Sequence, residues 1–389
     1  MENVIDIQEV QPQPQGALVT TIGVGGGGSN MINYLMQVNP HKSVKLIAAN
    51  TDVQALYKTN ADIKIKLGEK LTRGLGAGAQ PEIGEKAALE TYEEIKAALS
   101  GSDIVFISAG LGGGTGTGAA PVVAKAAKEI GALTVSVVTK PFKYEGGRRT
   151  KLAEEGLQNL KAESDCIVVI PNERVLSIIP KNYSRTETFN MINDVLARAV
   201  TGMSNVVLNC GEGDMNVDFA DVQTVMSYRG LALMGIGEAT GADAASEAMR
   251  LAIQSPLLDN ISIDGAKGVL VSFEAHPDYP MNALNDAMEI VHSLVDEDAN
   301  VVMGTYTRND VSADYVKVTV IATGFEKEIV TSANDTDMSN VQNPSAQAQD
   351  KGIQELNEHF RVVSQSFKEE HGLFENELDV PAYLRAARD

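Results

Sequence analysis

Residues 110–118 read Gly-Leu-Gly-Gly-Gly-Thr-Gly-Thr-Gly, and they join an apolar stretch at 103–109 to a helix-forming stretch at 119–130. Glycine at this density lets the backbone reach positive φ values and approach a ligand closely. The first turn of the helix that follows has free N–H groups and a partial positive charge. Thr115 and Thr117 add hydroxyl donors without bulk. A strand, a glycine loop and a helix N-terminus in this order predict a phosphate-binding site.

A second glycine-rich stretch lies upstream, between an apolar strand at 17–24 and a helix that we expect to begin at Met31. Gly23, Gly25 and Gly28 satisfy the G-x-G-x-x-G spacing of dinucleotide-binding folds, and Asp52 follows the next predicted strand, near the ribose position of such a fold. An NAD-dependent oxidoreductase is therefore one interpretation. Two glycine loops at the ends of two strands favour instead a nucleotide with a longer phosphate chain. The sequence contains no G-x-x-x-x-G-K-[ST] motif, which argues against a P-loop enzyme.

The composition narrows the class of protein. The 389 residues carry a formal net charge of −20, which argues against a non-specific nucleic-acid surface or an anionic-membrane surface. Cys166 and Cys210 have no CxxC partner or histidine cluster, so we interpret them as reduced thiols of a cytoplasmic protein and predict no metal site in the protein itself. No apolar run reaches transmembrane length, and residues 1–16 lack the basic region of a signal peptide.

The alternation of strands and helices from residue 17 onward predicts an α/β fold with a doubly wound, mostly parallel nucleotide-binding sheet. A long, largely apolar helix follows, and then an α+β domain in which the hairpin-like spacing of strands 300–307 and 315–322 suggests a mixed sheet. We therefore predict this division: a disordered N-terminal tail at 1–16, a nucleotide-binding domain at 17–185, a central helix at 186–209, a second domain at 210–325, a disordered linker at 326–374, and a partner-binding peptide at 375–389.

Six motifs in this order resemble the tubulin/FtsZ family, and most closely its FtsZ branch. They are GVGGGGSN at 23–30, NTDVQAL at 50–56, TRGLGAGAQPEIG at 72–84, GLGGGTGTGAAP at 110–121, NVDFADV at 216–222 and the terminal LDVPAYLR. The resemblance implies a tubulin-like fold and a GTPase that binds GTP or GDP with Mg²⁺ and polymerises into the cell-division ring, on the inner face of the membrane. A guanine-nucleotide-binding scaffold that does not polymerise is the milder alternative.

The resemblance also implies which residues contact the nucleotide. The second loop would hold the phosphates, residues 77–79 would close over the γ-phosphate end, and Phe189 would stack on guanine while Asn193, one helical turn later, reads its edge. Without the resemblance, Phe189 is better explained as core packing, and Glu145 and Arg149 as an i,i+4 ion pair on a solvated face. Ser29 stands where many members carry asparagine. The implied set is Gly26, Gly27, Gly28, Ser29, Asn30, Ala77, Gly78, Ala79, Gly114, Thr115, Gly116, Glu145, Arg149, Asn172, Phe189 and Asn193.

An acidic loop is the candidate for the catalytic step, and it includes Asn216, Asp218 and Asp221. A helix of 24 residues is about 36 Å long, so these aspartates cannot easily reach the glycine loops of their own subunit. We expect them to complete the pocket of the next subunit in a head-to-tail filament. The structural alternatives are that Asp218 caps the next helix and that Asp221 interacts favourably with its dipole.

The last residues of the chain suggest a second interaction. Apolar side chains return after a polar stretch, and the resemblance implies that they bind membrane tethers and division regulators such as FtsA. The residues concerned are Leu378, Val380, Pro381, Tyr383 and Leu384. The alternative is a frayed terminus that packs weakly on its own domain.

Overall fold

A computed structural model describes the central part of the chain, with short gaps: residues 16–38, 43–180, 182–208, 214–215, 217–228, 230–258, 263 and 265–325. The predictions for the N-terminal tail, for Asn216, for Cys210, for the linker and for the C-terminal peptide lie outside these residues. Within the described part, 16–175 and 189–325 belong to one compact unit, and 176–188 belongs to a second one.

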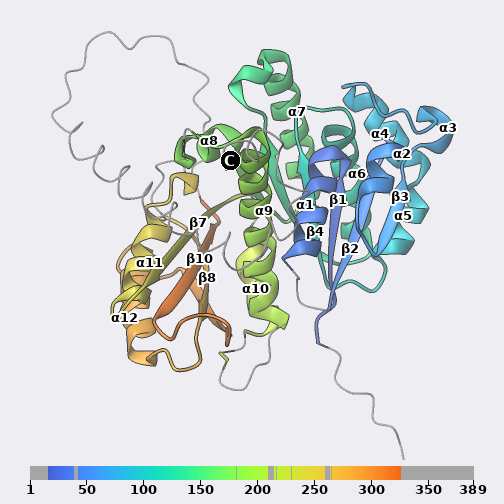
Figure 1. Cartoon of the computed structure of the whole chain (residues 1–389). Coiled ribbons are helices and arrows are strands. Elements are labelled where there is room, and N and C mark those ends of the chain that lie inside the picture. The colour runs from blue at the N-terminus through green and yellow to red at the C-terminus, as the bar shows by residue number, and fades with distance from the viewer. Residues whose placement is uncertain are drawn as a thin grey trace, which may run out of the picture. The chain divides into compact units, whose positions relative to one another are not determined.

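The first half of the compact unit contains six parallel strands, in the order β3-β2-β1-β4-β5-β6. All six residues of β1 are buried, as expected for a parallel strand that is covered on both faces. Figure 1 shows helices on both sides of these strands. The strands are β1 (Val19–Val24), β2 (Val44–Asn50), β3 (Ile63–Lys66), β4 (Ile104–Gly110), β5 (Leu133–Lys140) and β6 (Cys166–Pro171).

Helices connect these strands, and the two that follow β1 and β4 begin earlier than the sequence indicates. We expected a loop before Met31, but the helix starts at Gly25, and Thr115–Gly118 are likewise helical. Both glycine stretches are therefore helix N-termini rather than long loops. The helices are α1 (Gly25–Gln37), α2 (Val53–Lys58), α3 (Glu69–Thr72), α4 (Pro81–Glu90), α5 (Tyr92–Leu99), α6 (Thr115–Glu129), α7 (Gly147–Glu163) and α8 (Asn172–Ile178).

Helix α9 (Arg185–Leu208) confirms the predicted long helix, and its buried residues surround much of its circumference. A second set of strands follows, in the order β7-β10-β8-β9, with β10 antiparallel to both neighbours and β8 parallel to β9. The sheet is mixed, as predicted, but the two last strands are not hairpin partners, because β10 inserts between β7 and β8. The elements are α10 (Phe219–Met226), β7 (Gly230–Thr240), α11 (Ala244–Ile253), β8 (Gly268–Ala275), α12 (Met281–His292), β9 (Asn300–Thr307) and β10 (Tyr315–Thr323).

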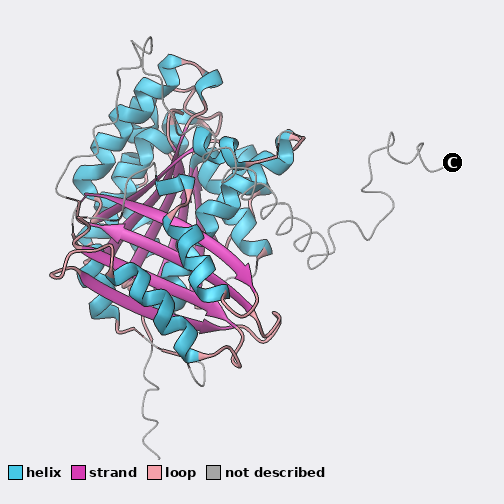
Figure 2. Ribbon diagram, turned by 90° about the vertical axis from the view of Figure 1, so that its left-hand side faces the viewer, coloured by secondary structure: helices cyan, strands magenta, loops and turns pink. Residues whose placement is uncertain are grey.

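Helices α11 and α12 pack on one face of this sheet and form a second core with it, which Figure 2 shows as two helices in front of the magenta strands. The two sheets join between β6 and β7, which pair in parallel over Cys166–Gly230, Ile167–Leu231 and Val168–Ala232. This seam makes one ten-stranded order from the two halves.

An ion cluster lies on the second sheet, and its side chains are mostly shielded from solvent. Glu274 on β8 accepts hydrogen bonds from Arg308 at 2.9 Å and from Lys317 on β10 at 3.1 Å. The Glu274 and Lys317 side chains are only 14% and 16% exposed. Burial opposes ionisation of Glu274, but the two cations outweigh it and hold its pKa below the usual range. The charges of this cluster therefore depend on one another, because removal of the Glu274 carboxylate would leave the shielded Lys317 ammonium without its partner.

Candidate nucleotide site

The two glycine stretches meet at the carboxyl ends of β1 and β4. A Cβ atom added to Gly25 would lie 2.8 Å from the backbone nitrogen of Gly116, and one added to Gly27 would lie 3.0 Å from that of Gly110. Gly25 also has φ +70°, which favours glycine. Because the two turns touch backbone to backbone, no side chain fits between them. The fold therefore places the N-termini of α1 and α6 next to each other.

These two helix N-termini are suited to an anion. Neither α1 nor α6 has an acidic residue in its first turn, and neither has a side chain that caps its first N–H groups. Gly26 and Gly27 are exposed, and a Cβ atom added to Gly26 or Gly113 would meet nothing within 4 Å. Unsatisfied N–H groups beside open space, at the positive ends of two helices, make a site for phosphate groups.

The loop that contains residues 77–79 adjoins the second glycine stretch. A Cβ atom on Gly114 would lie 2.8 Å from Cβ of Ala77. Gly78 and Ala79 both have φ +57°, so Ala79 is a non-glycine residue in the left-handed region. The same loop is fixed from β2, because Gly76 N–H donates to the Thr51 carbonyl at 3.2 Å. The structure thus brings the three predicted phosphate segments together.

Three neighbouring side chains are used for structure. The hydroxyl of Thr117, which we had expected to face the ligand, is buried and accepts a hydrogen bond of 2.8 Å from Gly112 N–H. Thr115 and Thr51 share a hydrogen bond of 2.6 Å between their hydroxyl oxygens, a link that sequence reasoning missed although Thr51 follows β2 at the same sheet edge. Asp52 caps α2 by accepting from the backbone N–H groups of residues 54 and 55, so its carboxylate has a structural role.

An aromatic group lies at the start of α9. The Phe189 side chain is 41% exposed, so it is not the ordinary core residue that its type alone suggests. Its ring meets Phe142 edge-on at a centroid distance of 6.1 Å, and Phe142 stacks on Tyr144 at 4.8 Å. Asn193 lies one turn after Phe189 and is half-buried. The exposed ring offers a flat apolar surface of the kind on which a base stacks. Sequence reasoning missed Phe142 and Tyr144.

Glu145 and Arg149 form the i,i+4 ion pair that the sequence offered as an alternative. Glu145 also accepts a hydrogen bond of 3.0 Å from Phe142 N–H, which ties the pair to the aromatic group. The Arg149 side chain is 49% exposed. The pair therefore has a structural role, and the exposed guanidinium still faces solvent.

Two of the predicted contact residues have a buried side-chain oxygen without a partner among the described residues. Asn172 begins α8 at the carboxyl end of β6, and its Oδ1 atom accepts no hydrogen bond within the described part of the chain. The Oγ atom of Ser29, in the first turns of α1, is likewise buried and unpaired among the described residues. Buried polar atoms are usually hydrogen-bonded, so these two have capacity for a ligand.

The acidic residues lie away from these segments. Asp218 occupies the N-cap position of α10, but its side chain makes no cap hydrogen bond, and Asp221 is exposed in the first turn. Both follow α9, whose 24 residues correspond to about 36 Å, whereas Phe189 lies at its start. Figure 1 shows α10 beyond the far end of α9. The described residues contain no group of three or more His, Cys, Asp or Glu side chains that is suited to hold a metal.

Comparison with known proteins agrees with this geometry. Residues 18–180 match the GTPase domain of the Tubulin/FtsZ family, and residues 230–326 match the C-terminal domain of the FtsZ family. The cell division protein FtsZ of Helicobacter pylori strain J99 is 46% identical over 386 residues, which is 98% of this chain and 96% of that protein. The same protein from strain 26695 is also 46% identical, over 389 residues.

Solved structures give the same result. An empty FtsZ dimer from M. jannaschii has a TM-score of 0.76 and 43% identity, covering 85% of this chain and 96% of that one. CetZ2 of Haloferax volcanii, solved as a GTPγS-bound protofilament, has a TM-score of 0.69 at 22% identity, covers 80% of this chain and 94% of its own, and shares the fold.

No helix among the described residues is both long and apolar enough to span a membrane. The glycine motif alone left open a choice between a nicotinamide dehydrogenase and a binder of a longer phosphate chain. The family matches decide it in favour of guanine nucleotides. The chain belongs to the tubulin/FtsZ family, and within it to the FtsZ cell-division GTPases.

Proposed function

We propose that this FtsZ-family GTPase hydrolyses GTP at the junction between two subunits, where the acidic loop of one subunit completes the nucleotide pocket of the next. The observation that carries the proposal is the position of Asp218 and Asp221. Both are exposed, neither side chain has a hydrogen-bond or ion-pair partner among the residues that the structure describes, and both lie beyond the end of α9 opposite Phe189. A head-to-tail contact would bring them to the N-termini of α1 and α6 in another subunit. Because a head-to-tail contact need not form a closed ring, it can repeat along an open filament.

The acidic residues near the glycine stretches already have structural partners, which supports a catalytic group from another subunit. Asp52 is occupied as the cap of α2, and Glu145 is occupied by Arg149 and by a backbone N–H group. Hydrolysis of a γ-phosphate requires a water that is held in line with the bond to be broken and a group that polarises it. In this proposal the exposed carboxylates of Asp218 and Asp221, together with Asn216 from the same stretch of sequence, orient that water from the adjoining subunit.

The remaining residues bind and position GTP. The N–H groups at the starts of α1 and α6 hold the phosphates, residues 77–79 cover their outer end, Asn172 pairs with a ribose hydroxyl, and Phe189 stacks on the base. Because the described residues offer no group of three or more His, Cys, Asp or Glu side chains suited to a metal, a Mg²⁺ ion would be held mainly by the phosphates, where it would neutralise their charge. Self-association is supported by the dimer solved for the M. jannaschii relative.

The test uses single-subunit defects that complement each other. Asp221→Ala should retain GTP binding but lose about 10²-fold in turnover, as for loss of a group that assists proton transfer or water positioning. Asp243→Ala is the matched control, because Asp243 is also exposed at a helix N-cap position in the same half and makes no cap hydrogen bond. Mixing Asp221→Ala with the pocket variant Thr115→Ala should restore turnover above the sum of the two. Turnover that never exceeds this sum and does not depend on protein concentration would contradict the shared site.

Light scattering after addition of GTP and Mg²⁺ separates a polymerising GTPase from a scaffold that only binds nucleotide.

For the C-terminal peptide, whose residues lie outside the described part, we propose that the apolar side chains at 378–384 bind a membrane tether of the FtsA type at the division site. Deleting 376–389 should leave GTP turnover near normal and abolish recruitment of filaments to tether-coated vesicles. A truncated protein that no longer binds GTP would show instead that the peptide belongs to the globular fold.

A further inference from the structure

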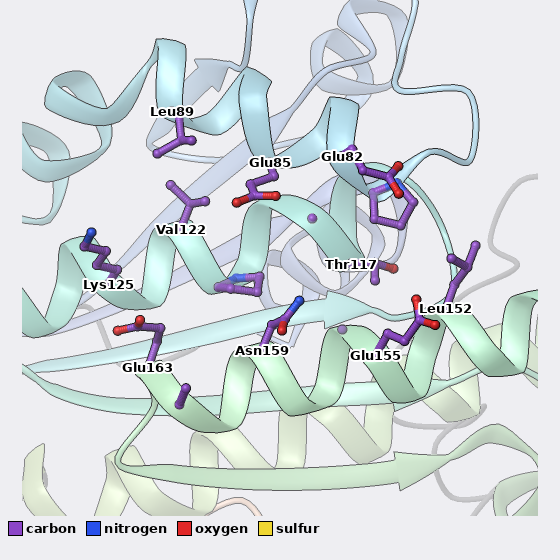
Figure 3. A pocket seen from close by; sticks show the side chains of 15 residues that line it. Glu82, Glu85, Leu89, Thr117, Val122, Lys125, Leu152, Glu155, Asn159 and Glu163 are labelled. Carbon is purple, nitrogen blue, oxygen red and sulfur yellow. The ribbon is translucent and has the colours of Figure 1, made fainter.

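A groove lies on the outer side of α6, between α4 and α7. Helix α6 packs closely on both neighbours: a Cβ atom on Gly118 would lie 1.9 Å from the Pro81 carbonyl oxygen of α4, and one on Gly156 of α7 would lie 2.3 Å from Thr117. Beyond these contacts the three helices leave a groove of about 560 Å³. Figure 3 shows that they run in the same direction, from the end with Glu82 to the end with Leu89. We call this feature the α4–α6–α7 groove: α6 forms its floor, and α4 and α7 form its two walls.

Both walls of the groove carry carboxylates. Helix α4 contributes Glu82 and Glu85, and α7 contributes Glu155 and Glu163. The only cationic side chain in the lining is Lys125 on α6. Glu82 and Glu85 form no ion pair with any other residue in the described part of the chain, and Figure 3 shows Glu85 and Asn159 on opposite sides of the groove. On the α7 wall, Glu155 has one ion-pair contact, a long and solvent-exposed one of 4.0 Å with Lys151. Because exposed pairs of this kind are weak, the excess of negative charge in the lining remains available to a cationic ligand.

The groove also exposes apolar surface. Leu89 is 51% exposed on the α4 wall, and Leu152 of α7 together with Pro121 and Val122 of α6 completes an apolar lining. Because the walls are helices whose backbone groups are hydrogen-bonded internally, they offer no edge to which a β-strand could add. A ligand must be recognised through its side chains, as when a helix lies in a groove.

The groove is distinct from the nucleotide site. None of the residues assigned to the phosphates, to the ribose or to the base lines it. Of the two threonines in the second glycine stretch, Thr117 lines the groove and Thr115 does not. The Thr117 hydroxyl already accepts a hydrogen bond from Gly112 N–H. A ligand in the groove would therefore not compete directly with GTP.

We propose that the α4–α6–α7 groove binds a cationic amphipathic helix of a partner protein. Apolar side chains of that helix would cover Leu89 and Leu152, and lysine or arginine on its two flanks would pair with Glu85 on one wall and Glu155 on the other. The complementarity of charge on both flanks fixes the ligand class, since an acidic or neutral helix would leave the carboxylates unpaired beside an apolar surface.

The proposal is tested with a synthetic probe on the full chain. The probe is a fluorescein-labelled amphipathic peptide of about 14 residues, or four helical turns, with leucine on one face and lysine elsewhere. Fluorescence anisotropy at physiological salt gives its Kd. The double variant Glu85→Gln and Glu155→Gln should weaken binding about fivefold or more, as for two exposed ion pairs. The matched control is Glu93→Gln with Glu94→Gln, which removes two exposed charges from α5 outside the groove.

Three results would overturn the proposal. One is absence of measurable binding to the native chain. Another is an equal loss of affinity in the groove variant and in the α5 control, which would mean that the peptide follows only the overall negative charge. The third is equal binding of a peptide in which serine replaces leucine, which would remove the role of the apolar lining. GTP affinity is measured for both double variants, and unchanged values show that they are folded.

Discussion

Replacing Phe189 separates base stacking from ordinary packing. Full burial of a phenylalanine side chain contributes roughly 1.5–3 kcal/mol relative to exposure. Phe189 is 41% exposed, so Phe189→Ala should cost about 1–2 kcal/mol of unfolding free energy in the nucleotide-free protein. If the ring also stacks on guanine, the same variant should lose a further 1–3 kcal/mol of GDP binding, which is about 5- to 150-fold in Kd.

Phe189→Leu is the matched control, because leucine keeps most of the apolar surface that meets Phe142 but has no aromatic face. Urea unfolding of this variant should lie close to that of the native chain, whereas its affinity for a fluorescent GDP analogue should remain reduced. Native affinity in both variants would refute stacking. Recovery of affinity by leucine alone would show that only apolar contact matters.

Three further predictions concern packing, charge and the buried thiol. Glu274→Gln should lower the free energy of unfolding by about 2–3 kcal/mol in urea titrations, and adding Lys317→Met should recover part of it, because breaking a buried pair costs more than replacing it. Since the pKa of Glu274 is depressed in the folded state, its contribution is present above the ordinary value of 4.5 and is lost as the pH falls through the folded pKa, so the native chain and Glu274→Gln should converge in stability on acidification. Gly118→Ala should destabilise by roughly 3 kcal/mol or prevent folding, because its Cβ would lie 1.9 Å from a carbonyl oxygen of α4, whereas Gly147→Ala, with nothing within 4 Å, should leave the melting temperature almost unchanged. Burial raises the pKa of the Cys166 thiol to about 12, so a variant with this single cysteine should react with a thiol reagent at neutral pH far more slowly when folded than in urea, and equal rates would contradict its burial.

Most strand positions were predictable because buried parallel strands appear in the sequence as short apolar runs. The predicted stretch 17–24 corresponds to β1 at Val19–Val24, and 300–307 matches β9. Strand order was not predictable in the same way. The close spacing of β9 and β10 indicated a hairpin, but β10 lies between β7 and β8, a placement that depends on contacts distant in sequence.

The glycine stretches show a second limit. Glycine is among the weakest helix formers, so its intrinsic propensity indicated a loop before Met31. A helix begins there nonetheless, at Gly25, where the backbone comes so close to Gly116 that an added Cβ would lie 2.8 Å from its nitrogen. The partnerless oxygens of Ser29 and Asn172 are likewise properties of burial, which a sequence does not display. The segments that hold the phosphates were recognisable, but the atoms left for a ligand were not.

The seam between β6 and β7 has a mechanical consequence. Ten strands are continuous by hydrogen bonding, yet within the described part of the chain only three residue pairs join the two halves of the sheet, between β6 and β7. Tension applied across the sheet would be concentrated on those few backbone hydrogen bonds, while each core shares its load over many contacts. Under such a force, the pairing between β6 and β7 should therefore break before either core unfolds. Helix α9 would still connect the two halves of the chain after these strands have separated.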